Sequence, residues 1–395
     1  MSDQIVNDFD SQLTPAERDL IERAKDFGQR VVAPNARQWE YDRRHPTESL
    51  RLACDQGLAG IQLSPAFRGH GYRFSVTMRV VEELSKYDFG FAFSLVNHHN
   101  AILSIAHAAP AVAERLVPRM LRGEVIGCAG YTEPDHGSDL AGLTTSAKKV
   151  DGGWLLDGAK AWICNGAVAG VVTALAQTDA RLGSKGLATF IVEADRIGFA
   201  REPAYALHGA HAMGVGGFRL ESYFAPDEAM LQPPGAGFKA SLAGINGARC
   251  YVAAMCAGML DSAIEPAVCY ASGRQAFGQK LIEFQGLRWS LVDAETDLAA
   301  LRLLAYRAAG QIDGGQDAEE AAAQAKKIAG QRTLGHVAAC IQAMGANGLR
   351  SDHPLMRHFA ACKTACFTDG TTEMMNERLG KLMTRRYLGK SGRPE

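Results

Sequence analysis

The sequence has few of the features that mark secreted or membrane proteins. Its 395 residues include nine cysteines, an odd number without a single Cys-x-x-Cys pair. This pattern argues against a disulfide framework or a zinc ribbon and favours a reducing compartment. The chain shows no basic segment followed by an apolar segment at its start, and no stretch reaches the ~18 uninterrupted apolar residues of a membrane span. We therefore expect a cytoplasmic protein without a membrane span.

A strong charge of either sign is also missing. Lys and Arg together number 42 and Asp and Glu number 43, which gives a formal net charge of -1. Because a general nucleic-acid binder is normally basic overall, we expect no nucleic-acid partner. Hydrophobic residues make up 47% and charged residues 22%, as in ordinary soluble globular proteins. At roughly 150 residues per domain, the length predicts two or three domains.

The first third of the chain has helical patterning. Thr14-Pro15-Ala16-Glu17 is a capping box with proline at the first helical position. Apolar residues follow at helical spacing, a second helix begins at Pro46-Thr47, and residues 76–122 are rich in Ala, Leu, Val and Glu. We therefore predict an N-terminal α-helical domain over residues 1–122.

From Glu124 onward, short runs of β-branched or alternating residues lie between glycine turns. Asp151-Gly152-Gly153 is a hairpin signal between two of these runs. No long helical pattern separates them, so we expect an antiparallel barrel or sandwich over residues 123–232. The predicted strands are 125–131, 143–150, 154–164, 171–177, 188–192 and 218–224.

The segment Pro233-Pro-Gly-Ala-Gly237 marks the next boundary, after which the pattern is again helical. The predicted helices are 238–272, 283–312, 317–347 and 355–388. Four long helices with short links favour a four-helix bundle over residues 233–395. The predicted fold class is therefore α+β, with a helical domain, an antiparallel β-barrel domain and a C-terminal bundle.

Several short motifs carry little information by themselves. Residues 214–217, Gly-Val-Gly-Gly, precede a strand rather than opening a helix, so we interpret them as a turn. Gly137-Ser138-Asp139 lacks the strand–turn–helix setting of a nucleophile elbow. His98 and His99 would point apart on a helix and are expected to be packing or pocket residues. Cys362 and Cys366 can share a helix face, but two thiols make no metal site, and no metal is predicted.

Three longer constellations are more informative. Residues 131–139, Tyr-Thr-Glu-Pro-Asp-His-Gly-Ser-Asp, and 160–166, Lys-Ala-Trp-Ile-Cys-Asn-Gly, combine a polar turn with the flat face of Trp162. Backbone N–H groups and hydroxyls in such a turn suit phosphates and carbonyls, so the pair favours a planar heteroaromatic cofactor with a diphosphate tail. In residues 274–280, Arg-Gln-Ala-Phe-Gly-Gln-Lys, Arg274 is a fixed cation that suits the same diphosphate. In the third, residues 342–348 and 367–373, a carboxylate stands beside a glycine that allows close approach of a ligand.

In this order and on this layout, the three constellations resemble the acyl-CoA dehydrogenase flavoprotein family, from about residue 14 to about residue 388. The resemblance implies an FAD-dependent oxidoreductase acting on a CH–CH bond of an acyl-CoA. It also implies a homo-oligomer, usually a tetramer, with electron-transfer flavoprotein as the electron acceptor. Positions that match the family's flavin surroundings are Tyr131, Thr132, Gly137, Ser138, Trp162, Cys164 and Thr371. Positions through which a neighbouring subunit usually holds the rest of the FAD are Arg274, Phe277, Gln285, Gln342 and Gly345.

The resemblance also assigns the reacting groups. Asp369 matches the catalytic carboxylate, which removes the α-proton while the β-hydrogen leaves as hydride to flavin N5. A base in contact with this weakly acidic C–H is required, together with hydrogen bonds to the developing enolate. By resemblance, the backbone N–H of Asp369 and a flavin ribityl hydroxyl hold the thioester oxygen. The positions that match the substrate site are Arg249, Asn246, Ser138 and Gly370.

The sequence departs from the family pattern near this site. Asp369 stands where the family usually has Glu and is shorter by about 1.5 Å of reach. Some family branches carry the base just before the helix arginine, but here that position is Ala248. Asp88 is a weaker second candidate and is expected mainly to end a helix. Cys164 stands where a threonine is common, and residues 207–213 and 357–362 lack the family's usual arginine-containing stretch and Arg-Asp pair.

These departures leave three alternatives open. An acyl-carrier-protein thioester dehydrogenase, a flavin oxidase or monooxygenase of the same fold, and a flavin-binding protein with little turnover all fit the motifs. Ala248 leaves room near the thioester, while Phe93 and His98 are placed to crowd the far end of the pocket. The sequence therefore favours a short, branched or cyclic acyl group.

Overall fold

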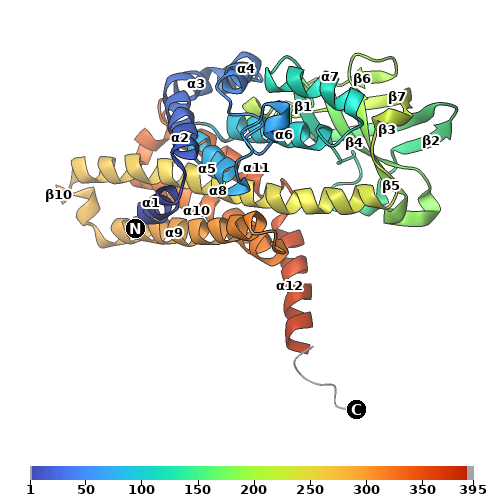
Figure 1. The fold of residues 1–395 in the computed structure, drawn as a ribbon. Coiled ribbons are helices and arrows are strands. Elements are labelled where there is room, and N and C mark those ends of the chain that lie inside the picture. The colour runs from blue at the N-terminus through green and yellow to red at the C-terminus, as the bar shows by residue number, and fades with distance from the viewer. Residues whose placement is uncertain (1, 389–395) are drawn as a thin grey trace, which may run out of the picture. The chain divides into compact units, whose positions relative to one another are not determined.

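The computed structural model of the chain describes residues 2–388, and Figure 1 follows their course by colour. By its internal contacts the chain divides into two compact units. One unit contains the residues up to 21, residues 78–89 and the residues from 245 onward, and we call it the helical unit. The other contains residues 22–77 and 90–244, and we call it the sheet unit. The two boundaries between the three predicted domains follow changes of secondary structure and stay a prediction.

The predicted helical first third is confirmed. Thr14 and Glu17 form the expected capping box: the Thr14 N–H donates to Glu17 Oε2 at 2.9 Å, and the Glu17 N–H donates to Thr14 Oγ1 at 3.2 Å. The predicted stretch 76–122 contains three helices, because tight turns at residues 86–88 and 106–109 interrupt it. The helices of this part are α1 (Ser2–Ser11), α2 (Pro15–Phe27), α3 (Ala33–Asp42), α4 (Thr47–Asp55), α5 (Phe74–Ser85), α6 (Phe89–Ile105) and α7 (Pro110–Leu121).

The middle of the chain forms one eight-stranded sheet in the order β6-β7-β3-β2-β4-β5-β8, with β1 paired to β4. Five of the pairings between its described strands are antiparallel, as expected, but β1–β4 and β2–β4 are parallel. Parallel pairing is possible here because connections longer than a hairpin loop precede β4. The strands are β1 (Gly127–Gly130), β2 (Ser146–Val150), β3 (Gly153–Ile163), β4 (Val171–Gln177), β5 (Leu187–Glu193), β6 (Phe199–Arg201), β7 (Gly216–Pro226) and β8 (Met230–Gln232).

The sequence analysis missed β6 and β8, which have three residues each and so show no readable alternation. Its interpretation of residues 214–217 as turn chemistry is supported. Gly214 has a φ of 56° and follows a short 3-10 turn, and β7 begins at Gly216.

The C-terminal third contains α8 (Ala236–Gly273), a hairpin of β9 (Gln275–Ala276) and β10 (Gln279–Lys280), α9 (Gln285–Asp313) and α10 (Glu319–Met344). These match the first three predicted helices. The prediction of a single fourth helix over 355–388 is wrong, because the chain forms α11 (Leu355–Ala365) and α12 (Thr372–Leu388). Asp369 and Gly370 lie between them with φ values of 53° and 97°. A right-handed helix cannot continue through two left-handed residues.

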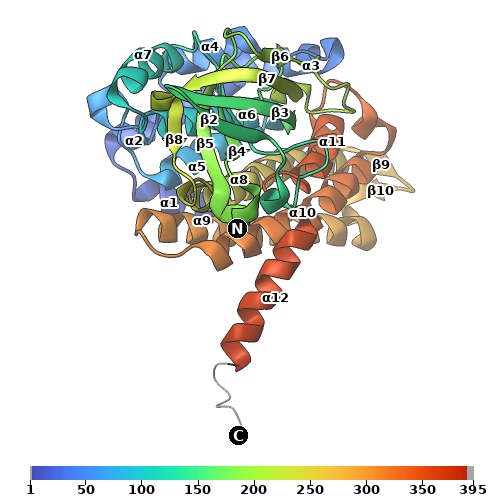
Figure 2. The same ribbon diagram turned by 90° about the vertical axis from the view of Figure 1, so that its right-hand side faces the viewer.

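Figure 2 shows α12 projecting away from α9 and α10 of the helical unit, and its one buried side chain among the described residues is Met375. By length and composition, α8 alone among the described helices could cross a membrane. However, 67% of the most apolar 18-residue segment of α8 is buried in the structure, as is typical of a helix in the core of a protein. The expected absence of a membrane span stays a prediction.

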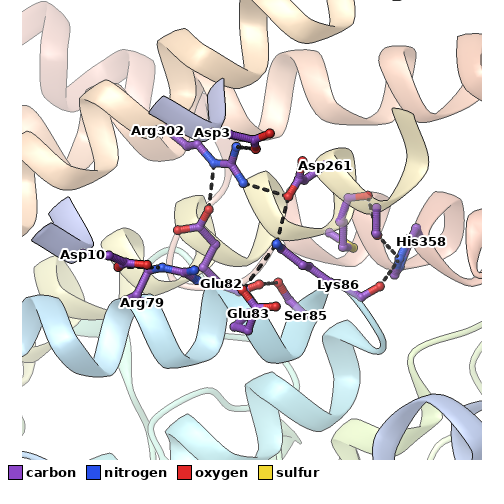
Figure 3. A network of polar contacts seen from close by, with 12 residues as sticks. Asp3, Asp10, Arg79, Glu82, Glu83, Ser85, Lys86, Asp261, Arg302 and His358 are labelled. Atoms are coloured by element: carbon purple, nitrogen blue, oxygen red, sulfur yellow. Dashed lines mark hydrogen bonds and ion pairs between the residues drawn. The ribbon is translucent and has the colours of Figure 1, made fainter. Parts of the chain in front are cut away.

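A buried network of charges joins four helices of the helical unit (Figure 3). Arg302 of α9 donates to Glu82 of α5 at 2.8 Å and to Asp261 of α8 at 2.9 Å. Lys86 pairs with the same Asp261 at 3.0 Å, and Arg79 of α5 reaches Asp10 of α1 at 3.3 Å. Because the side chains of Arg302 and Glu82 are each only 1% exposed, every charge there needs its partner.

Candidate active site

The predicted base lies in the turn that separates α11 from α12. Arg249 of α8 holds this turn, since its Nε donates to the carbonyl oxygen of Asp369 at 3.1 Å. Its Nη1 donates to Asn246 Oδ1 at 2.8 Å. A side chain built on Gly370 would lie 3.5 Å from Arg249 Nη2, so the glycine also adjoins the guanidinium. The structure therefore brings together Asp369, Gly370, Arg249 and Asn246, which the sequence analysis had assigned to the catalytic and substrate sites.

The carboxyl group of Asp369 is in a low-dielectric environment. Burial raises the pKa of Asp369, while the nearby charges of Lys326 and Arg249 act in the opposite direction. Burial also lowers the pKa of Arg249 to about 10. A carboxylate whose pKa is raised is a stronger base than a solvated one, which is what removal of a weakly acidic C–H requires.

Lys326 is a residue of this site that the sequence analysis did not find. It lies on α10 with 0% of its surface exposed, and its ammonium donates to the carbonyl oxygens of Ala365 at 2.7 Å and Gly370 at 3.4 Å. Neighbouring alanines of α10, including Ala322, Ala325 and Ala329, are buried as well. The one signal in the sequence was therefore a lysine within an apolar stripe of a helix. A lysine is rarely buried there unless its charge has a partner.

Asp88, the weaker candidate for the base, has a structural role at the end of a helix. Asp88 follows α5, its N–H donates to the carbonyl oxygen of Leu84 at 3.2 Å, and its carboxylate lies 3.8 Å from Arg357 Nε. This agrees with its expected place at a helix end. Thr371 has a local contact too, because its Oγ1 accepts a hydrogen bond at 3.3 Å from the Met374 N–H in the first turn of α12. The predicted contact of Thr371 with the cofactor stays a prediction.

In the sheet unit, Trp162 is held in a conformation that is rare for a tryptophan. Its φ is 60°, it lies at a register shift between β3 and β7, and 60% of its surface is exposed. Tyr205 packs edge-on against the indole, with 4.8 Å between ring centroids. Left-handed backbone at a bulky residue costs free energy and concentrates at functional sites. An exposed indole fixed in this way fits the predicted stacking surface for a planar cofactor.

The loop after Trp162 is fixed from inside the sheet unit. Asn165 also has a left-handed φ, of 62°. Its Nδ2 donates to the Ser94 carbonyl oxygen at 2.9 Å, and its Oδ1 accepts from Ser94 Oγ at 2.7 Å. The buried Cys164 thiol donates to the Met213 carbonyl oxygen at 3.3 Å. The predicted approach of Cys164 to the flavin stays a prediction.

A buried ion pair joins the two segments of the first constellation. Lys160 Nζ lies 2.9 Å from Glu133 Oε1, and the two side chains are 0% and 2% exposed. The Glu133 carboxylate also accepts backbone N–H groups of Thr144 at 2.8 Å and Thr145 at 2.9 Å. Burial alone would raise the pKa of Glu133, but Lys160 and these hydrogen bonds outweigh it and lower that pKa to about 2. The sequence analysis quoted both residues without giving either a role.

The remaining predicted flavin residues lie beside this ion pair. Tyr131 packs against a core of Leu143, Leu175 and Leu187, and burial raises the pKa of its hydroxyl. The Thr132 carbonyl oxygen accepts from the Ala161 N–H at 3.0 Å, which ties the turn to β3. Gly137 and Ser138 are exposed in the turn that follows. The exposed turn and its hydroxyls fit the donor set of a flavin nucleotide.

The predicted partner-subunit residues lie at two exposed places of the helical unit. Phe277 and Gly278 form the turn of the β9–β10 hairpin with φ values of 53° and 82°. The Phe277 side chain is 97% exposed. Arg274 precedes the hairpin and Gln285 begins α9, while Gln342 and Gly345 lie exposed at the end of α10. Their exposure is what the predicted contact with a neighbouring subunit requires.

His98 and His99, which were expected to be either packing or pocket residues, are packing residues. His98 accepts from the Gly127 N–H at 2.9 Å, and its other ring nitrogen is 2.9 Å from the Met120 carbonyl oxygen. His99 accepts from the Gly60 N–H at 3.1 Å. No group of three or more His, Cys, Asp or Glu side chains among residues 2–388 could hold a metal ion.

A cavity of about 310 Å³ lies in the sheet unit beside Tyr205. Basic side chains of Arg43, Arg44 and Arg201 contribute to its wall, together with Glu202. None of the residues assigned to the flavin or the substrate lines it, so it adds nothing to the predicted site.

Comparison with known proteins decides the family. The models of the N-terminal, middle and C-terminal domains of acyl-CoA dehydrogenase match residues 14–124, 128–223 and 235–384. The chain belongs to the acyl-CoA dehydrogenase family. It is therefore an FAD-dependent oxidoreductase of the group that acts on CH–CH bonds of acyl-CoA, and the predicted family, fold class and cofactor are confirmed.

Three similar proteins illustrate the family. The short-chain specific acyl-CoA dehydrogenase of Megasphaera elsdenii is 29% identical over 93% of this chain and 97% of its own length. A glutaryl-CoA dehydrogenase of Mycobacterium smegmatis, solved in complex with FADH2, is 26% identical with a TM-score of 0.89, covering 96% of this chain and 97% of that one. A chain solved in work on the electron transferring flavoprotein of Acidaminococcus fermentans is 27% identical with a TM-score of 0.90, covering 95% and 99%.

Proposed function

We propose that this acyl-CoA dehydrogenase oxidises the Cα–Cβ bond of a short, branched or cyclic acyl-CoA, with Asp369 as the base. The observation that carries the proposal is the conformation of the turn. Asp369 is left-handed, its own carbonyl oxygen is held by Arg249, and its carboxyl group is desolvated. Aspartate tolerates a left-handed φ better than most residues do, so the residue type suits the turn.

Each residue of the chain would have its own role in the reaction. The carboxylate of Asp369 would take the α-proton, and a backbone N–H of the same turn would donate to the thioester oxygen, where negative charge develops. Bound FAD supplies the acceptor for the two electrons that leave with the β-hydrogen. Trp162 on its fixed backbone would orient the planar cofactor, and Arg249 would keep the base in place. Position matters because a shift of about 1 Å can cost on the order of 10²-fold in rate.

The substrate class rests on two supports. Ala248 places no bulk or carboxylate next to Arg249, and the similar proteins include enzymes named for short-chain and glutaryl thioesters. Electron-transfer flavoprotein as acceptor, a homotetramer and a cytoplasmic location belong to the same proposal. The likeness to a chain from work on an electron transferring flavoprotein supports the acceptor.

The proposal is tested by anaerobic titration of the flavin absorbance with straight, branched and cyclic acyl-CoA thioesters. Wild-type protein should bleach with one class of short thioester, and Asp369→Asn should bind the thioester but bleach at least 10²-fold more slowly. Asp88→Asn is the matched control, because Asp88 is the other carboxylate that sequence analysis considered. Bleaching by Asp369→Asn at the wild-type rate would remove Asp369 as the base.

A second candidate is a flavin oxidase of the same fold. It is favoured by Cys164, whose thiol is a weaker donor than the usual threonine hydroxyl and already donates to the Met213 carbonyl oxygen. The substrate-reduced enzyme mixed with O₂ distinguishes the two. Reoxidation within one turnover with formation of peroxide supports the oxidase, and slow reoxidation supports the dehydrogenase.

A further inference from the structure

Lys326 contacts both ends of the turn that carries Asp369. Its ammonium donates to the carbonyl oxygen of Ala365, the last residue of α11, at 2.7 Å. It also donates to the carbonyl oxygen of Gly370, the residue after Asp369, at 3.4 Å. One buried cation thus spans the break between the helices and fixes the distance between its ends. The Ala365 contact also satisfies a carbonyl that the end of a helix leaves without a partner.

Burying the Lys326 ammonium costs folding free energy, which a functional role would explain. The residue is fully buried, and burial lowers the pKa of its ammonium. Replacing a buried ion with an apolar side chain of similar volume is often neutral or stabilising. Met at this position would therefore pack within the helices as well as Lys326 does. The two hydrogen bonds to carbonyl oxygens indicate instead that the lysine is needed to hold the turn.

Several titratable groups face this ammonium and the Asp369 carboxyl. Arg249 and Cys256 come from α8, Cys366 and Asp369 from the turn, and Glu373 from the first turn of α12. Among these groups Lys326 exerts the larger attraction on the Asp369 carboxylate, ahead of Arg249. The cation that holds the turn is thus also the main counter-charge of the proposed base.

We propose that Lys326 is a positioning residue, which fixes the Asp369 turn through the Ala365 and Gly370 carbonyl oxygens and supplies the counter-charge of the Asp369 carboxylate. This inference rests on the proposed function, because Asp369 is the base in it. It adds a residue outside the three sequence constellations to the machinery of proton removal. The hydrogen bonds of the Lys326 ammonium to the Ala365 and Gly370 carbonyl oxygens hold the turn, so its effect reaches the substrate through Asp369.

The test compares Lys326→Met with Lys327→Met in FAD-loaded protein. Lys327 is the next residue on α10 and receives the same substitution, so it controls for loss of one positive charge from this helix. The measurement is the rate of anaerobic flavin reduction by the best thioester as a function of pH. In Lys326→Met the maximal rate should fall by about 10- to 10²-fold. The acidic limb of the profile should also move to higher pH, because the carboxylate loses its counter-charge.

Each result decides between positioning and a purely structural role. Lys326→Arg keeps the charge and should restore the position of the acidic limb, while Lys326→Gln keeps a donor without charge and should not. If Lys326→Met unfolds, the comparison of Lys326→Arg with Lys326→Gln carries the test. An unchanged pH profile in the folded Met or Gln variant overturns the inference.

Failure of this inference is separable from failure of the proposed function. If Asp369→Asn is inactive while Lys326→Met or Lys326→Gln retains the wild-type rate and pH profile, only the role of Lys326 is wrong. If Asp369→Asn reduces its flavin at the wild-type rate, Asp369 is not the base and both proposals fall.

Discussion

The ion pair between Glu133 and Lys160 lets a single substitution test how the flavin segments are held. Both side chains are buried, so Glu133→Gln leaves an ammonium without its counter-charge. Removing one partner of a buried pair costs roughly 3–5 kcal/mol, and we expect that loss in the free energy of unfolding. FAD should also be released more easily, because Thr132 and Trp162 lie in the two segments that the pair joins. Urea unfolding and the absorbance ratio of flavin to protein measure the two effects.

The control for this prediction is the double variant Glu133→Gln/Lys160→Met. Removing both charges should restore much of the lost stability, because no ion is left unpaired. The pH dependence gives a further check. Since the effect of burial is outweighed by Lys160 and the hydrogen bonds to Thr144 and Thr145, which lower the folded pKa of Glu133 to about 2 from its ordinary value of 4.5, its stabilisation is present above about pH 4.5. It is lost as pH falls toward 2. Equal acid sensitivity of wild type and Glu133→Gln would contradict the role of the pair.

At the same scale, the sequence predicted residues better than it predicted their contacts. Asp369, Arg249 and Asn246 were chosen by motif, and the structure brings them together. Lys326 and the Glu133–Lys160 pair were not given roles, because a lysine in a helix or strand pattern is usually solvated. Only the three-dimensional structure shows that these charges are buried and what they hold.

At the scale of elements, the turn between α11 and α12 is the feature most open to test. Gly370 has a φ of 97°, and a Cβ there would lie 3.0 Å from the Met375 side chain. Gly370→Ala should therefore strain the turn, displace Asp369 and lower the rate of flavin reduction on the order of 10²-fold. Because most of the predicted flavin residues, including Tyr131 and Trp162, lie outside this turn, FAD content should largely be retained. Stopped-flow reduction and the flavin-to-protein ratio measure both.

Gly380→Ala is the matched control for this turn. Gly380 lies inside α12, and a Cβ there meets nothing within 4 Å. Alanine stabilises a helix interior relative to glycine by roughly 0.5–1 kcal/mol, so this variant should be active and slightly more stable. A wild-type rate in Gly370→Ala would show that the left-handed turn does not position the base.

Elements with a strong local pattern were predicted closely, and those without one were not. The capping box at Thr14, the strand Val171–Gln177 and the helices of 238–347 appear where the pattern places them. The prediction missed the break at residues 366–371 although Asp369-Gly370 is a turn signal in the sequence. Its left-handed Asp369 is visible only in backbone geometry. The same holds for Trp162, whose strand pattern conceals a positive φ.

At the scale of the whole molecule, secondary-structure classes and compact units divide the chain differently. The sequence changes from helix to strand to helix, which predicted three consecutive domains. By contacts, the helical unit instead gathers residues from three separate stretches of the chain. Such long-range assembly leaves little trace in a local pattern, because it depends on buried partners such as Glu82 and Arg302, far apart in sequence.

The β9–β10 hairpin before α9 allows a test of the predicted contact between subunits. Phe277 is 97% exposed, so Phe277→Ala should leave the unfolding free energy of the single chain nearly unchanged. If Phe277 meets a neighbouring subunit and its FAD, loss of this aromatic anchor should cost roughly 2 kcal/mol or more at that contact. FAD should then bind about thirtyfold more weakly, and sedimentation should show smaller oligomers.

Ile197 provides the control for that substitution, because it is equally exposed, at 97%, and lies outside every predicted site. Ile197→Ala should retain both FAD and the oligomeric state. The two variants remove similar exposed apolar surface. A difference between them is therefore due to the position of Phe277 in the hairpin and not to the loss of apolar surface itself. If Phe277→Ala keeps its FAD and sediments like the wild type, the hairpin is not the subunit contact. In that case the FAD would have to be held without Phe277, and Arg274 and Gln285 beside the hairpin would need the same test.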